Sequence, residues 1–134
     1  MKKIIFTLLL LPLLLTGCDK MEDNGDFAGQ WQLTEWKNLA GGQIVADKTT
    51  GIYYCVQLDL MSFQYKKQYL ARFRRTSDSL FIGTVYYGSK DEIVGYDQLA
   101  DCGVPANGKF AIDRLTRKAL VLRSDEAVLT FRKY

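Results

Sequence analysis

The chain has 134 residues, with 18 Lys and Arg against 15 Asp and Glu, and it contains no histidine. The lack of histidine excludes His-based nucleophilic triads, histidine metal sites and the usual proton shuttle at neutral pH. Lys2 and Lys3 lie in an apolar leader, and without them 16 bases face 15 acids. The charge therefore gives no indication of nucleic acid as a partner.

Residues 1–17 have the pattern of a secretory leader. Lys2 and Lys3 precede an apolar run at residues 4–15, interrupted only by Thr7 and Pro12. A helix of about 12 residues spans roughly 18 Å, against roughly 30 Å for the hydrocarbon core of a bilayer. A cleaved signal peptide is therefore favoured over a transmembrane anchor.

The leader ends in Leu15-Thr16-Gly17-Cys18, which resembles the lipobox of bacterial lipoproteins. This resemblance implies cleavage before Cys18 and a lipid on Cys18. The protein is then expected at the outer membrane of a Gram-negative bacterium, on the periplasmic or the surface face, with the membrane as a partner. Residues 18–26 are polar and acidic, as in a flexible tether. Residues 27–134 are long enough for one domain with a core.

The domain is expected to be all-β, because short β-rich segments separated by turn residues recur and no long amphipathic helix is present. The clearest segment is 52–60, where Tyr54 and Val56 alternate with Tyr53 and Cys55. Strands are predicted at residues 29–37, 52–60, 63–75, 80–87, 92–96, 109–115, 118–123 and 127–133.

The connections between these strands are mostly short, which favours antiparallel neighbours in a meander. The longest connection is 38–51, and 97–108 is irregular, with a single helical turn that Asp97 could cap. Eight antiparallel strands with one apolar face are expected to close into a barrel, since closure removes exposed sheet edges. An open sheet or a two-sheet sandwich is the structural alternative.

Gly29-Gln30-Trp31 resembles the Gly-x-Trp signature of lipocalins. The closing run, residues 110–134, is similar to the end of small lipocalin-like lipoproteins of Bacteroidetes. The resemblance implies a lipocalin-like barrel over residues 27–134, with Trp31 closing one end under a basic residue of the last strand. Arg132 is the candidate for that residue, in a cation–π contact with a structural role. The chain is shorter than a full lipocalin and has no evident long C-terminal helix.

If Cys18 carries lipid, Cys55 and Cys102 remain as an even pair in an oxidising compartment. A disulfide between them would close a loop of about 48 residues and stabilise the fold by about 4 kcal/mol on the chain-entropy model. The alternative is two unpaired cysteines, one on a strand and one in a loop.

The predicted inward face is rich in aromatic residues, which could line a ligand pocket or fill the core. The candidates for ligand contact are Tyr54, Tyr65, Tyr69 and Phe73, and Phe63, Phe110 and Phe131 share the same face. A filled core is favoured, because eight strands enclose little more than their own side chains. On this interpretation Phe73 lies deeper than Tyr69, which is nearer the strand's entry.

The leading hypothesis for function is non-enzymatic binding of a small apolar or amphipathic molecule. The alternative is an interaction module that docks on another envelope protein or a glycan through its outer surface, where Trp36, Tyr53 and Tyr87 are expected. A basic cluster is interpreted as a solvated face; it comprises Lys66, Lys67, Arg72, Arg74 and Arg75. No phosphate loop, nucleophile elbow or cysteine–histidine pair is present, so no catalytic residue, metal or cofactor is expected.

Overall fold

The computed structural model describes residues 24–88 and 92–134, and Cys18 and the predicted leader lie outside this part of the chain. The described chain consists of β-strands with two short 3-10 helices. The elements are η1 (Gly25–Phe27), β1 (Gly29–Asn38), β2 (Ile44–Asp47), β3 (Tyr53–Gln57), β4 (Leu60–Tyr65), β5 (Lys67–Arg75), β6 (Ser79–Tyr87), β7 (Ile93–Val94), η2 (Tyr96–Cys102), β8 (Lys109–Leu115), β9 (Ala119–Arg123) and β10 (Ala127–Lys133).

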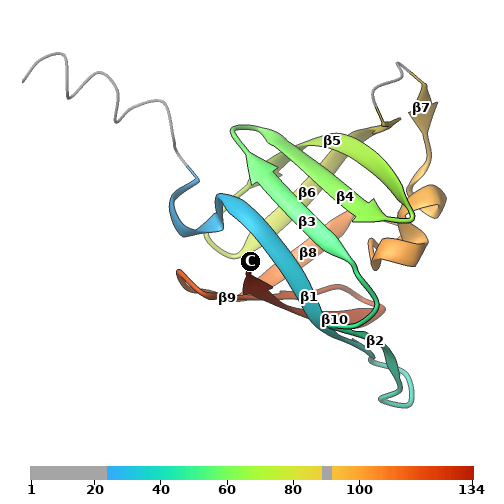
Figure 1. Cartoon of the computed structure of the whole chain (residues 1–134), viewed down its shortest axis with the longest axis vertical. Helices are drawn as coiled ribbons and strands as arrows, with labels where there is room; N and C mark the ends of the chain where they lie inside the picture. Colours follow the sequence, from blue (N-terminus) through green and yellow to red (C-terminus); the bar gives the residue numbers. More distant parts are fainter. Residues whose placement is uncertain (1–23, 89–91) are drawn as a thin grey trace, which may run out of the picture.

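Eight strands form a closed antiparallel barrel, which confirms the predicted fold class. The order around the wall is β1, β3, β4, β5, β6, β8, β9 and β10, and β10 pairs with β1 to close the ring. The two remaining strands are additions to the wall: β2 pairs with the second half of β1, and β7 pairs with β6. The helices η1 and η2 lie at opposite ends of the barrel (Figure 1).

Two predicted strand boundaries are wrong. The strand predicted at 63–75 is in fact most of β4 and all of β5, which turn at Lys66, and the strand predicted at 52–60 ends before a turn at Leu58 and Asp59. Leu58 and Lys66 have φ angles of 55° and 61°. These left-handed conformations are usual for glycine and uncommon for leucine and lysine, so residue type gave no turn signal.

Two segments outside the wall also differ from the predictions. The connection predicted at 38–51 contains β2, which extends the sheet edge that β3 leaves free on β1. The strand predicted at 92–96 shrinks to β7, with only two residues, and it lies beside the wall. Consequently β1 and β6 each have two successive partners along one edge, which lengthens the barrel at the end where η2 lies.

The helical turn predicted within 97–108 is the longer helix η2. Its N-cap is Gly95, which has no side chain, so the predicted cap by Asp97 is wrong. The helix ends at Cys102 and is capped by Gly103, which adopts a φ of 87°. A Cβ at Gly103 would lie 2.9 Å from the Leu129 side chain, so a residue without Cβ lets η2 pack directly on β10.

Aromatic and aliphatic side chains pack the interior of the described barrel. The Tyr54 ring lies 4.7 Å from the rings of both Phe63 and Phe131, and all three side chains are buried. Further side chains with no exposed surface are Leu33, Met61, Leu80, Phe110, Leu120, Leu122 and Leu129. This part of the interior is a filled core, in agreement with the prediction from the sequence.

Trp31 is fully buried and closes the end of the barrel under η1. Its indole Nε1–H donates a hydrogen bond of 2.8 Å to the Phe27 carbonyl. The Lys133 ammonium lies 4.1 Å from the indole ring centroid and donates to the carbonyls of Asp26, at 2.9 Å, and Ala28. Lys133 thereby ties η1, the first strand and the last strand together.

The basic residue over Trp31 is Lys133, so the prediction of Arg132 is wrong. Trp31 is paired in register with Lys133, whereas Arg132 is paired with Gln32. Adjacent strand residues point to opposite faces, so Arg132 lies outside, where its Nε donates to Gln32 Oε1 at 2.7 Å. Gly29 makes room for the lysine: its φ is 118°, and a Cβ there would lie 3.1 Å from Lys133 Nζ.

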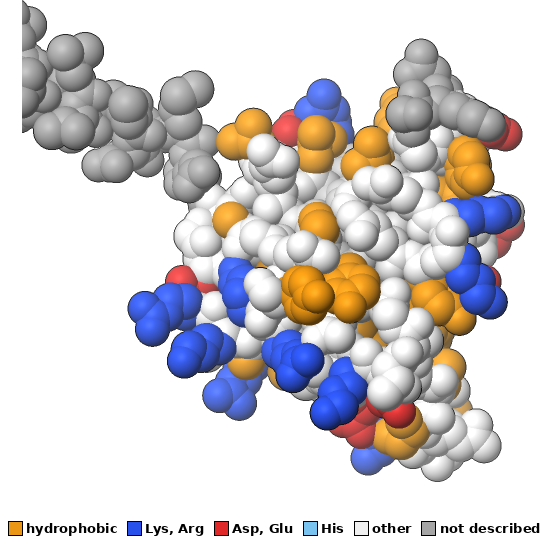
Figure 2. All heavy atoms as spheres, viewed as in Figure 1, with side chains coloured by type: hydrophobic (Ala, Val, Ile, Leu, Met, Phe, Trp, Pro, Cys, Tyr) orange, Lys and Arg blue, Asp and Glu red, His pale blue; other side chains and the backbone are white. Residues whose placement is uncertain are grey.

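The last three strands carry an excess of positive charge. Residues 109–134 contain seven Lys and Arg against three Asp and Glu. Figure 2 shows Lys and Arg side chains gathered along the lower left of the molecule, on the side where β9, β10 and the C-terminus lie in Figure 1. The positive charge is thus concentrated on one part of the barrel surface.

Replacing Lys133 with methionine should destabilise the fold by about 1–3 kcal/mol, because two hydrogen bonds and a cation–π contact are lost. The matched change Arg132→Met removes a neighbouring charge whose side chain is exposed, and it should cost less than about 1 kcal/mol. Urea unfolding of the full chain measures both. Equal losses in the two variants would contradict the role assigned to Lys133.

Candidate functional site

The hydroxyl of Tyr54, a candidate for ligand contact, is engaged within the protein. It donates a 2.6 Å hydrogen bond to the Cys102 carbonyl of η2. Burial is the main cause that raises the pKa of Tyr54, and Cys102 adds to it. Tyr54 therefore anchors η2 across the end of the barrel and belongs to the core, so it is not free to contact a ligand.

The other three candidates do not form one wall. Tyr69 is 4% exposed and packs edge-on against Tyr87 at 5.4 Å, so it lies in the core. Tyr65 is half-buried at the η2 end, and Phe73 is half-buried near the η1 end, 5.6 Å from the Phe27 ring. The expectation that Phe73 lies deeper than Tyr69 is wrong: Tyr69 is covered by Tyr87, whereas Phe73 is half-buried just beyond the irregularity between Ala71 and Phe73 in the pairing of β5 with β6.

The structure does not contain the predicted disulfide, because Cys55 and Cys102 are both free. Tyr54 points into the core, so Cys55, the next residue of β3, points outward, and Gln64 Nε2 lies 3.8 Å from its Sγ. Cys102 is buried in the core beneath η2. The two sulfurs therefore lie on different sides of the barrel wall. Strand alternation predicts that Cys55 points outward, but the sequence alone does not show that Cys102 lies inside.

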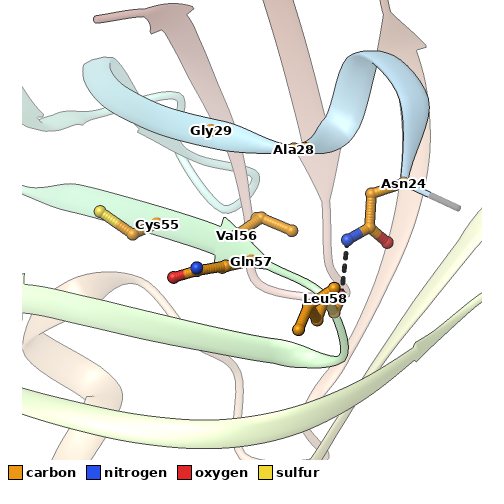
Figure 3. Close-up of a pocket in the computed structure, with 7 residues that line it drawn as sticks. All are labelled: Asn24, Ala28, Gly29, Cys55, Val56, Gln57 and Leu58. Atoms are coloured by element: carbon orange, nitrogen blue, oxygen red, sulfur yellow. Dashed lines mark hydrogen bonds between the residues drawn. The ribbon is translucent and has the colours of Figure 1, made fainter. Parts of the chain in front are cut away.

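A groove of about 500 Å³ lies beside η1 (Figure 3). Its lining is Asn24, Ala28, Gly29, Cys55, Val56, Gln57 and Leu58. Asn24 Nδ2 donates a 2.6 Å hydrogen bond to the Leu58 carbonyl across it. The lining has no charged side chain and offers few polar groups to orient a ligand, so it is a weak candidate site.

A second hollow, of about 210 Å³, lies at the other end of the barrel, and we call it the mouth pocket. It is lined by Trp36, Val45, Ala46, Thr50, Ile52, Tyr65, Lys66 and Asp101. These residues come from β1, β2, the β2–β3 connection, the end of β4, the β4–β5 turn and η2. Apolar and aromatic walls with a few polar groups are typical of small-molecule sites.

Trp36, one of the residues that line the mouth pocket, carries an unusual buried polar group. Among the described residues, its Nε1 is the one buried side-chain nitrogen or oxygen that has no hydrogen-bond partner. Nearly all buried donors in proteins are paired, and an unpaired donor costs about 1–3 kcal/mol. A ligand with an acceptor atom could satisfy this N–H.

Trp36 was predicted on the outer surface, and this prediction is wrong. Trp31 and Leu33 are buried, so strict alternation would put Trp36 outside. The pairing of β1 with β10 shifts between Leu33 and Glu35, which inserts one residue and reverses the alternation beyond it. Trp36 then pairs with buried Leu129 and packs against the core.

The rim of the mouth pocket brings an aromatic ring and two opposite charges together. The Lys66 ammonium lies 5.1 Å from the Tyr65 ring centroid, and Asp101 of η2 also lines the pocket. Asp47, which follows the lining residue Ala46 but does not itself line the pocket, accepts hydrogen bonds from the Thr49 hydroxyl and backbone N–H, and these lower the pKa of Asp47. The rim can therefore accommodate a polar head group beside an apolar wall.

The basic cluster predicted from the sequence is divided between the two ends of β5. Lys66 and Lys67 lie at the η2 end, whereas Arg74 and Arg75 lie toward the η1 end. Arg72 pairs with Asp59, and both side chains are largely exposed. The cluster is thus a solvated surface and not a single binding patch.

Within residues 24–88 and 92–134, no three His, Cys, Asp or Glu side chains are grouped so that they could hold a metal ion. In the same part of the chain, no helix is both long and apolar enough to cross a membrane. The mouth pocket is smaller than the groove beside η1, but it combines apolar and aromatic walls with charged groups, and we take it as the candidate site for this reason.

Comparison with known proteins agrees with the fold. A family described as "Lipocalin-like domain" matches residues 13–134. A lipocalin-like protein from Bacteroides uniformis is 22% identical, with a TM-score of 0.62 over 81% of this chain and 99% of that one. An uncharacterized protein from Bacteroides eggerthii is 21% identical, with a TM-score of 0.56 over 80% and 98%. A protein from Burkholderia xenovorans is 18% identical, with a TM-score of 0.54 over 79% and 81%. No curated protein matches the chain.

The two described cysteines should differ sharply in reactivity. Burial, with a smaller effect of Asp101, raises the pKa of Cys102 to about 12, so its thiol stays protonated and inaccessible. The thiolate is the reactive form, so an alkylating reagent should modify half-exposed Cys55 in the folded chain and Cys102 only after unfolding. Peptide mass spectrometry of the alkylated full chain measures both. A 55–102 disulfide-linked peptide would contradict the observed geometry.

Proposed function

The chain belongs to the lipocalin-like domain family, and from this premise we propose that it is a lipid-anchored, non-enzymatic envelope protein that binds a small amphipathic molecule in the mouth pocket. The observation that carries the proposal is the unpaired, buried indole N–H of Trp36 beside that pocket. Since every other buried side-chain donor in the described part of the chain has a partner, this N–H is the donor that an acceptor group of a ligand would satisfy. The interior is less suitable, because Tyr54 and Tyr69 belong to its packed core.

The dimensions of the mouth pocket define the class of ligand. Its 210 Å³ is below the range of roughly 300–1,000 Å³ that encloses drug-sized molecules. The ligand therefore inserts one end and leaves the remainder at the rim. The neighbouring surface is apolar, since Val45 and Ile44 are 49% and 55% exposed. An acceptor group at Trp36 with an apolar chain along β2 matches this arrangement.

The same exposed residues of β2 support the alternative function, docking on another envelope protein. Leu39, Ile44 and Val45 are all at least 49% exposed on the β1–β2 hairpin, which projects from the barrel (Figure 1). A partner would cover these residues without entering the mouth pocket. Ligand binding that depends on Trp36 distinguishes the first function from this one.

The anchor at Cys18 is supported by the leader and its lipobox-like end. If the anchor is correct, Cys18→Ser should move the protein from the membrane fraction to the soluble fraction, with the fold intact. The experiment is fractionation of cells that express the full chain. The control is Cys55→Ser, which removes a different thiol and keeps Cys18. Membrane retention of Cys18→Ser would refute the lipid anchor.

For the mouth pocket, Trp36→Phe should weaken ligand binding by up to about tenfold, the value of one hydrogen bond of about 1.4 kcal/mol. The probe is 1-anilinonaphthalene-8-sulfonate, an amphiphile with acceptor oxygens, titrated by fluorescence into the full chain in mild detergent. Tyr53→Phe is the matched control, since Tyr53 lies on the outer face of β3.

Native mass spectrometry of the protein purified from its own envelope tests the same site with the natural ligand. Wild type and Tyr53→Phe should retain a small molecule that Trp36→Phe loses. Equal probe affinity in all three proteins, at equal thermal stability, would contradict the mouth pocket as the site.

A further inference from the structure

We propose that the η1 end of the barrel docks on a leaflet of anionic phospholipid, so that the mouth pocket faces away from the membrane. The docking surface comprises the β3–β4 turn, the β8–β9 turn and the outer residues at the end of β10. This inference rests on the lipid anchor at Cys18 that is part of the proposed function. It adds which surface of the domain meets the bilayer and which chemistry holds it there.

The sheet register places these segments at one end. Gly29, where β1 begins beside η1, is paired with Val56, one residue before the end of β3. The last residue of β10, Lys133, is paired with Trp31 and donates its backbone N–H to the Lys118 carbonyl at 2.9 Å. The β3–β4 turn, the β8–β9 turn and the end of β10 therefore surround η1.

The short segment that precedes the barrel limits how far this end can lie from the anchor. Six peptide units separate Cys18 from Asn24, which corresponds to at most about 22 Å when fully extended. Asn24 is held at the η1 end, because its side chain bonds the Leu58 carbonyl and its own carbonyl accepts from Arg75 at 3.3 Å. A lipid on Cys18 would thus keep the η1 end next to the bilayer and the mouth pocket remote from it.

The charge at and beside the β8–β9 turn matches an anionic surface. Arg114, Arg117 and Lys118 are exposed, and no described carboxylate forms an ion pair with them. The nearby Asp113 is paired with Arg123 at 3.0 Å. Figure 2 shows this accumulation of basic side chains on the side of β9 and β10. Each basic residue close to an anionic lipid surface strengthens the binding of the protein to that surface by about fivefold.

Leu58 provides an independent observation. It is 56% exposed at the tip of the β3–β4 turn, with a φ of 55°. This left-handed conformation is energetically unfavourable for leucine, whereas glycine or asparagine would adopt it readily. An exposed apolar side chain at a protruding turn gains free energy when it enters the boundary between head groups and acyl chains. Leu58 and the basic residues together form an amphipathic surface of the kind that lies on membranes.

The test uses the full chain, expressed with its leader, purified in detergent and reconstituted into vesicles of phosphatidylglycerol and phosphatidylethanolamine. Amide hydrogen exchange should slow at the Leu58–Asp59 and 116–118 turns, relative to the detergent-bound protein. It should not change at the 47–50 turn beside the mouth pocket. In vesicles of phosphatidylcholine alone, this protection should be lost.

Two triple variants with the same change of charge isolate the surface. Arg114→Glu/Arg117→Glu/Lys118→Glu should lose the protection at Leu58, because the charge of the β8–β9 turn is reversed. Lys37→Glu/Lys48→Glu/Lys67→Glu, at the opposite end and outside the lining of the mouth pocket, should keep it. Thermal melts show whether each variant is folded, and Leu58→Asn, whose side chain suits the left-handed turn, provides a fold-preserving variant that should also lose protection.

The outcomes separate this inference from the proposed function. Protein that fails to float with vesicles refutes the anchor, and with it the basis of the docking surface. Protein that floats but shows no slowing at the η1 end refutes the docking surface and leaves the anchor standing. Equal protection in phosphatidylcholine, or in both triple variants, would overturn recognition of anionic lipid and indicate a different partner for this end.

Discussion

The seam between β1 and β10 is the contact on which the whole barrel depends. It joins the first and last strands of the domain, and without it the other strands would form an open sheet with two long free edges. Lys133 fixes the seam at one end, because its ammonium bonds the carbonyls beside η1 and covers the Trp31 ring. Burial lowers the pKa of Lys133, opposed by Asp26, so the contact is made at some cost in desolvation.

Once the seam is closed, register decides which side chains can serve a ligand. The pairing of β1 with β10 shifts between Leu33 and Glu35, and this one extra residue moves Trp36 from the outer surface to the mouth pocket. Before the shift, β1 contributes Trp31 and Leu33 to a packed interior. Beyond it, the same strand contributes an indole whose N–H has no partner. A single irregularity therefore separates the structural half of β1 from the half that can bind.

The sequence predicted the barrel because alternation and short connections are properties of single strands and survive in the fold. It did not predict the turns at Leu58 and Lys66, since their left-handed backbone is imposed by hairpin geometry on residues that do not favour it. The predicted number of eight strands agrees with the wall only because two errors compensate: β4 and β5 were merged, and β7 was counted. The positions of Trp36, Lys133 and the two free cysteines depend on how the strands pair in register. A local sequence pattern does not contain this information.

The net charge of the chain does not show how the charged residues are distributed over the fold. The chain after the predicted leader is nearly neutral, with 16 bases and 15 acids, yet residues 109–134 hold seven of the bases and three of the acids. In the rest of the described chain, residues 24–88 and 92–108, seven bases face eight acids, so the excess of positive charge forms a basic surface on the last three strands. Because β9 begins and β10 ends beside η1, part of that basic surface lies where the chain enters the barrel. Attraction to anionic lipid there would orient the domain, and a mouth pocket at the opposite end would stay open to solvent, where an amphipathic ligand can be taken up and released.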